Sequence, residues 1–189
     1  MSQFAQFDSS QTRPTKLGRE FDFTIRSAEA ADVETLAGIA AEREGQPVAI
    51  WHASFEKYFD RSLDRATHQL LVAVRAGITL GYAKSQYFAP VTGAPENVAP
   101  AGWYLTGVIV RPEHRRLGIG LGLTTARLDR IARTHTESFY FCNAKNAVSI
   151  ALHERLGFAE HTRDFWFPKV HFEGGSGILF RKAMKVQTT

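Results

Sequence analysis

The chain has few of the residues that mark secreted, disulfide-rich or membrane proteins. Cys142 is the one cysteine among 189 residues, so no disulfide can form within the chain. No apolar run approaches the ~18–20 residues that a membrane-spanning helix needs. The polar segment 1–20 also lacks the apolar core of a secretion signal. We therefore expect a reduced, cytoplasmic protein that does not bind a membrane.

Signatures of nucleic-acid and zinc binding are also missing. The net charge is +4, but no aromatic stripe interleaves the basic residues, and no histidines or cysteines have zinc-site spacing. We therefore expect neither a nucleic-acid partner nor a metal. A phosphorylated ligand would explain three of the arginines, and a solvated helix face is predicted for three others. The first group is Arg111, Arg115 and Arg116, and the second is Arg127, Arg130 and Arg133.

What is present indicates a globular protein with one core. The hydrophobic fraction of 44% and charged fraction of 22% are typical of such proteins. We predict a disordered tail at 1–20 and a single domain at 21–189. Strands are expected at 21–26, 70–75, 78–88, 103–110, 138–143, 158–167 and 178–184. Helices are expected at 30–44, 49–65, 121–133 and 146–156. This order predicts a single mixed α/β or α+β structure.

The segment 110–120 carries the strongest functional signal. It follows an apolar strand, precedes a helix, and contains the pattern Arg-Arg-Leu-Gly-Ile-Gly. Gly118 and Gly120 allow backbone N–H groups to face inward, where no Cβ blocks a ligand. The helix start adds unpaired N–H donors and partial positive charge, which together suit a phosphate or pyrophosphate. A Rossmann loop would need a further glycine where Leu123 stands.

Two segments together resemble the GNAT superfamily of N-acetyltransferases. Arg115, Gly118 and Gly120 match its acetyl-CoA motif, Arg/Gln-x-x-Gly-x-Gly/Ala. Segment 146–158 resembles a second family segment, with His153 where tyrosine usually stands. The likeness covers about 23–185. It implies a mixed, mostly antiparallel central sheet flanked by helices, with two strands splayed at the acetyl-CoA site.

The resemblance also implies which residues hold acetyl-CoA. The pyrophosphate would lie on the backbone of 116–121, with Arg115 or Arg116 adding charge, and the pantetheine arm along 108–110. Asn146 would bind pantetheine or serve only as a helix N-cap, and both interpretations stay open. The implied cofactor residues are Val108, Ile109, Val110, Arg115, Arg116, Leu117, Gly118, Ile119, Gly120, Leu121 and Asn146.

Two catalytic roles can be assigned by the same resemblance. The backbone N–H of Val108 would stabilise the oxyanion, and His153 would protonate the leaving thiolate or be only structural. The family's glutamate base is replaced by Phe141, so the base is open. Water or a charged residue elsewhere could serve, and an acylated Cys142 is not expected. The candidate bases are Glu42, Glu44, His52, His171 and Glu173.

The acceptor is expected to be a small-molecule amine. Aromatic residues with a few acids suit a cationic ring, and an aminoglycoside-like amino sugar is the first hypothesis. The alternatives are a protein N-terminus or lysine, and a non-catalytic acyl-CoA-binding module. A homodimer is left open. The candidate acceptor residues are Glu42, Trp51, Trp103, Tyr104 and Glu173.

Overall fold

The computed structural model describes residues 2–3, 22–60 and 66–185. The predicted tail at 1–20 lies almost entirely outside these residues. A seven-stranded, mostly antiparallel sheet forms the centre of the fold, as predicted. Its order is β2 (Thr24–Ser27), β3 (His68–Arg75), β4 (Ile78–Phe88), β5 (Gly102–Val110), β6 (Glu137–Asn143), β9 (Gly177–Ala183) and β7 (Ala159–Thr162).

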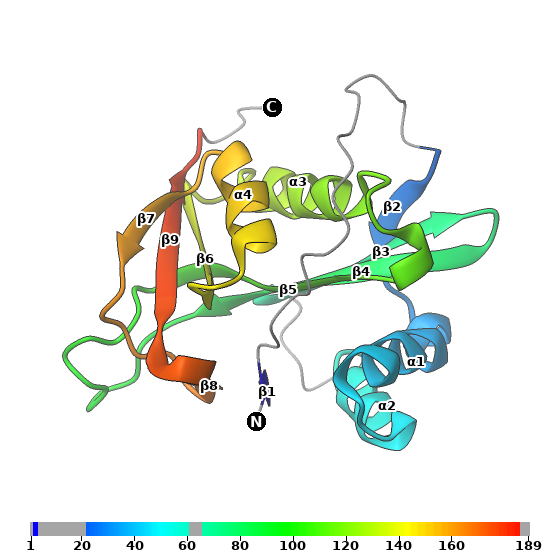
Figure 1. The fold of residues 1–189 in the computed structure, drawn as a ribbon, viewed down its shortest axis with the longest axis horizontal. Helices are drawn as coiled ribbons and strands as arrows, with labels where there is room; N and C mark the ends of the chain where they lie inside the picture. Colours follow the sequence, from blue (N-terminus) through cyan, green and yellow to red (C-terminus); the bar gives the residue numbers. More distant parts are fainter. Residues whose placement is uncertain (1, 4–21, 61–65, 186–189) are drawn as a thin grey trace. The chain divides into compact units, whose positions relative to one another are not determined.

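The described ranges contain four α-helices (Figure 1). They are α1 (Val33–Glu44), α2 (Val48–Glu56), α3 (Ile119–Ile131) and α4 (Ala147–Arg155). Short 3-10 turns are η1 (Ala30–Asp32), η2 (Pro112–His114) and η3 (Glu173–Gly175), and β1 (Ser2–Gln3) pairs with β8 (Val170–His171). Strands β5 and β6 are parallel, and their register covers only Trp103–Leu105 and Ser138–Tyr140, although β5 continues to Val110. The splay beyond these pairs stays a prediction.

Most element boundaries differ from the sequence prediction by at least one residue, and three of these differences concern α2, α3 and β7. Helix α2 ends at Glu56 because the N–H groups of Tyr58 and Phe59 close three-residue turns onto Phe55 and Glu56. The rest of the predicted helix, 61–65, lies outside the described residues. Helix α3 begins two residues early, at Ile119. Strand β7 stops at Thr162, and Trp166 instead bonds through its backbone to Asn97 and Ala99.

By its contacts the chain divides into two compact units, each described by itself. The first comprises 1–14, 87–105 and 128–189, and the second comprises 15–86 and 106–127. In the second unit, α1 and α2 pack together against one face of β3 and β4, and the first turns of α3 pack on the other face (Figure 1). The core beneath α1 and α2 consists of Val33, Leu36, Ala37, Ile39, Ala40, Phe55, Leu70, Val72 and Tyr82.

The first unit has two cores, on opposite faces of β6. Because side chains alternate along a strand, Tyr140 and Cys142 join α4 on one face, whereas Phe139 and Phe141 join an aromatic cluster on the other. The aromatic cluster is continuous, since the Phe141 ring lies 4.9 Å from that of Phe167. This unit therefore buries most of its aromatic residues as structural core.

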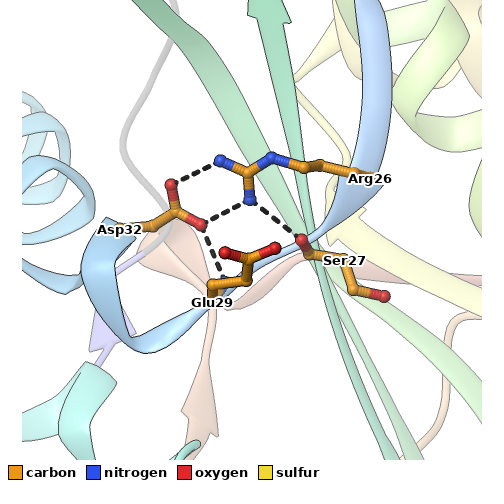
Figure 2. Close-up of polar contacts among 4 residues, drawn as sticks. All are labelled: Arg26, Ser27, Glu29 and Asp32. Carbon is orange, nitrogen blue, oxygen red and sulfur yellow. Dashed lines mark hydrogen bonds and ion pairs between the residues drawn. The ribbon is translucent and has the colours of Figure 1, made fainter. Parts of the chain in front are cut away.

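A polar cluster holds the start of α1 against β2. Figure 2 shows Arg26 donating two hydrogen bonds to the carboxylate of Asp32, at 2.7 and 2.8 Å. The backbone N–H of Glu29 also donates to Asp32, at 2.7 Å. Asp32 directly precedes α1, but its side chain makes no cap bond to this helix. Its carboxylate instead closes η1, and the pKa of Asp32 is lowered chiefly by the hydrogen bond from Arg26.

Candidate active site

The loop between β5 and α3 contains the residues that the sequence predicts to bind phosphate. After η2, Arg116 and Gly118 take positive φ angles of 65° and 81° before α3 begins at Ile119. Left-handed residues alternating with right-handed ones turn successive N–H groups inward, and this geometry binds anions. A positive φ costs a non-glycine residue about 1–2 kcal/mol, so the conformation of Arg116 is maintained against its own preference. Gly120 belongs to the first turn of α3.

The side chains of this loop separate into buried and exposed groups. Ile119 is buried against β3 and β4 and anchors the helix start. Arg115 and Arg116 are exposed, and Leu117 is 46% exposed. Arg115 donates through Nε to the Val110 carbonyl at 3.3 Å. The side chains of two arginines are therefore exposed on this loop.

Strand β5 leads into the loop through residues packed on both faces. Val108 and Val110 contact the core beneath α3, whereas Ile109 contacts the core beneath α1 and α2. Strand β4 comes unusually close here, because a Cβ added to Gly81 would lie 2.4 Å from the Ile109 carbonyl oxygen. Val108, the predicted oxyanion donor, is therefore held in a packed strand.

Arg127 was predicted on a solvated helix face, and that prediction was wrong. Its side chain is 1% exposed and donates through Nη1 to the carbonyls of Lys84 and Gly107, at 2.8 and 3.0 Å. Its Nη2 donates to Thr124 Oγ1 at 3.0 Å. A guanidinium is long enough to cross from α3 to the sheet and has enough donors to bond two strands at once. Helical periodicity does not reveal such a role.

Sequence analysis also missed a group of donors on the other face of β4. Lys84 extends toward α2, with Nζ 5.8 Å from the ring centroid of Phe55. Burial lowers the pKa of Lys84, and the nearby carboxylate of Glu44 opposes this shift only in part. Tyr82, on the same face, is 1% exposed and meets Phe55 edge-on at 5.2 Å. The only sequence signal was a lysine within an apolar strand.

In the first unit, α4 presents the second predicted motif. Asn146 accepts from the N–H of Ser149 at 3.1 Å, so it is the N-cap, and this leaves a further role toward pantetheine as a prediction. His153 is 1% exposed and stacks on Tyr140, with ring centroids 3.5 Å apart. Its Nδ1 lies 2.8 Å from the Ser149 carbonyl. Because a carbonyl only accepts, Nδ1 must carry the hydrogen.

Two other residues near α4 have clear structural roles. Tyr140 donates its hydroxyl to Ser149 Oγ. Cys142 is buried on the face of β6 opposite Phe141, and burial raises the pKa of its thiol. A raised pKa disfavours the thiolate, the nucleophilic form of cysteine. Phe141 lies in the aromatic core, 3% exposed, so this position cannot provide a base.

The candidate acceptor residues differ in how exposed they are. Trp103 and Tyr104 were expected on the acceptor surface, but they are 4% and 0% exposed and pack in two different cores. Their apolar ring area accounts for this, and the Tyr104 hydroxyl is satisfied by donation to the Pro100 carbonyl at 2.6 Å. Glu42 is exposed on α1, and Trp51 is half-buried on α2. The side chain of Glu173 lies outside what the structure describes.

The described residues of each unit line an open cavity. In the second unit, a cavity of about 430 Å³ lies between α1 and α2, and its polar lining is Glu34, His52, Glu56 and Asp60. In the first unit, a cavity of about 250 Å³ is lined mainly by aromatic residues of 165–172, and Trp166 there is 40% exposed. Across the described ranges, no three metal-ligating side chains converge. None of the helices in those ranges has the length and apolarity to cross a membrane.

Comparison with known proteins gives the class. The FR47-like protein family model matches residues 90–167. The L-methionine sulfoximine/L-methionine sulfone acetyltransferase of Pseudomonas aeruginosa is 30% identical over 142 residues, which cover 71% of this chain and 79% of that protein. The chain therefore belongs to the GNAT superfamily of acetyl-CoA-dependent N-acetyltransferases.

Solved structures share the fold. The ribosomal-protein-alanine N-acetyltransferase of Brucella melitensis has a TM-score of 0.62 at 24% identity, covering 85% of this chain and 99% of its own. A phosphinothricin acetyltransferase of Sinorhizobium meliloti, solved with acetyl-CoA, has a TM-score of 0.62 at 19% identity, covering 88% and 91%. At these identities the likeness is one of fold alone.

Proposed function

We propose that the chain transfers the acetyl group of acetyl-CoA to the primary amine of a small molecule. The observation that carries this proposal is the loop before α3, where Arg116 and Gly118 hold positive φ angles beside a helix start. Such a backbone suits the pyrophosphate of coenzyme A. Exposed Arg115 or Arg116 adds a charge-assisted hydrogen bond.

The remaining cofactor contacts follow the resemblance. The backbone of Val108–Val110 would hydrogen-bond the pantetheine arm as an added strand does. Asn146 would add a contact through the amide N–H₂ group, which stays available while its carbonyl caps α4.

The reaction is a direct attack in a ternary complex. The neutral amine nitrogen attacks the thioester carbon, a C–N bond forms, and the Val108 N–H donates to the resulting oxyanion. Collapse of this intermediate breaks the C–S bond and releases coenzyme A as a thiolate. The nitrogen loses one proton to a base or water, and the thiolate gains one. Because Nδ1 of His153 donates to a carbonyl, Nε2 could supply that proton only from an imidazolium.

We infer an amino-acid analogue as the first acceptor class. The relative at 30% identity is named for L-methionine sulfoximine and L-methionine sulfone. An aminoglycoside-like amino sugar is the second candidate. Three carboxylates around the cavity between α1 and α2 favour it, because they would attract a polycation. Exposed Glu42 lies on one of the same helices, and Trp51 lies on the other.

The decisive experiment is a thiol-release assay with acetyl-CoA and a panel of amines. The panel contains L-methionine sulfone, an aminoglycoside, a polyamine and an N-terminal peptide, and mass spectrometry identifies the acetylated product. We expect turnover with a small amine. Turnover of the peptide alone would instead establish a protein acetyltransferase. Binding of acetyl-CoA without turnover of any amine would indicate a regulatory module. The open question of a homodimer is tested by analytical ultracentrifugation.

A further inference from the structure

Lys84 is a cation in a mostly apolar setting. Its Nζ lies over the Phe55 ring, and its stem lies beside the bare Cα of Gly107, where a Cβ would be 4.0 Å from Lys84 Cε. Within the described ranges, Nζ forms no hydrogen bond and no ion pair. The charged groups that affect this region come from α1, where Glu44 is paired with Arg43 at 3.2 Å.

Two further donors in the same core lack partners. The hydroxyl of Tyr82 and Nε1 of Trp51 are buried and, in the part of the chain that the structure describes, form no hydrogen bond. An indole N–H and an ammonium can only donate, and a phenol donates readily. Buried donors without acceptors are costly, so among the described residues this face of the second unit has more donors than acceptors that satisfy them.

Lys84, one of these hydrogen-bond donors, lies near the proposed oxyanion donor. Gly107 directly precedes Val108, the residue proposed to bind the oxyanion, and Lys84 lies beside Gly107 on the face covered by α1 and α2. The strand segment is fixed from the other face, because Arg127 bonds the carbonyls of both Lys84 and Gly107. Lys84 therefore lies beside the residue that precedes the proposed oxyanion donor, within one unit.

We propose that Lys84 binds a carboxylate of the acceptor, which makes the acceptor class α-amino acids and their analogues. This inference rests on the proposed function and deepens it. An anionic ligand supplies an acceptor to this half-buried ammonium, and it offsets the cost of holding that charge partly out of water. Lys84 also repels polycations, so aminoglycosides are disfavoured at this position.

The test compares L-methionine sulfone with its α-carboxamide as acceptors. The amide removes the negative charge but keeps the amine and the side chain. Because the amide also changes the basicity of the amine, the ratio of the two kcat/KM values is compared between protein variants. We expect the wild type to prefer the carboxylate by about 10- to 100-fold, the range for a hydrogen bond to a charged group.

Lys84→Met should bring this ratio near to unity, and Lys84→Arg should restore much of it. Lys57, an exposed lysine at the end of α2, provides the matched control, and Lys57→Met should keep the wild-type ratio. Acetyl-CoA affinity and thermal melting, measured for each variant, show whether the fold and the cofactor loop are intact.

The outcomes separate this inference from the proposed function. If the wild type acetylates no amine, the proposed function fails. If it acetylates amines but Lys84→Met keeps the carboxylate preference, only the assignment of Lys84 is overturned. If Lys84→Met slows the acid and the amide equally, Lys84 acts in the reaction itself, for example as the base, and carboxylate binding is also overturned.

Discussion

Gly118 offers the sharpest test of the phosphate-binding loop. Its φ is 81°, and Gly93, in a loop of the other unit, has φ of 83° with no neighbouring atom within 4 Å of an added Cβ. Valine at either position therefore imposes a similar backbone strain, of order 1–3 kcal/mol. Only Gly118→Val places a branched side chain in the loop proposed to bind pyrophosphate. The pair thus separates strain from ligand contact.

The magnitude follows from the contacts that would be lost. A backbone N–H bonded to a charged phosphate oxygen contributes roughly 1.5–3 kcal/mol. At about 1.4 kcal/mol per factor of ten, losing one such bond weakens binding about 10- to 150-fold, and losing two weakens it further. Isothermal titration with acetyl-CoA should show this loss for Gly118→Val but not for Gly93→Val, while both melt at lower temperatures than the wild type.

A shortened donor makes the test more specific. Acetyl-pantetheine carries the same thioester but no pyrophosphate, so its turnover should be similar in the Gly118→Val variant and the wild type. If the folded Gly118→Val protein binds acetyl-CoA with wild-type affinity, the loop before α3 does not hold the pyrophosphate.

Three further predictions test the α4 motif and the supporting packing. The His153→Phe variant keeps a ring that stacks on β6 but has no proton to donate, so its kcat should be about 10²-fold lower than that of the wild type, with unchanged acetyl-CoA affinity. An unchanged kcat would show that His153 is purely structural. The Gly81→Ala variant should melt at a lower temperature than the wild type, because the new Cβ would lie 2.4 Å from a β5 carbonyl oxygen. The Gly38→Ala variant, which changes an open helical position, should melt at a slightly higher temperature. Equal shifts in the two variants would contradict the close approach of the strands. The pKa of Asp32 is lowered in the folded state, so its contribution to stability is present above about pH 3.9 and is lost as the pH falls below it; urea unfolding of Asp32→Asn should show less dependence on pH in this range, and an unaltered dependence would refute the role of the ion pair.

The sequence alone predicted the class of the protein and the loop that we propose binds its cofactor. Alternating and helical apolar patterns predicted the main strands and helices. The pattern of Arg115, Gly118 and Gly120 located the loop because glycine spacing and charge act over a few adjacent residues. That Asn146 could cap the helix of the second motif was also predictable, because a cap bond joins residues only three positions apart.

The tertiary structure decided which of these side chains are accessible and which residues from distant segments meet. Trp103 and Tyr104 were expected on a surface but are buried, because burial depends on what packs against a strand as well as on its own pattern. Arg127 joins Lys84 to Gly107 across 43 and 20 residues of sequence separation, and Lys84 meets Phe55 from another element. Such contacts form only when the strands pair and the helices pack on them, so residue spacing in the sequence does not predict them.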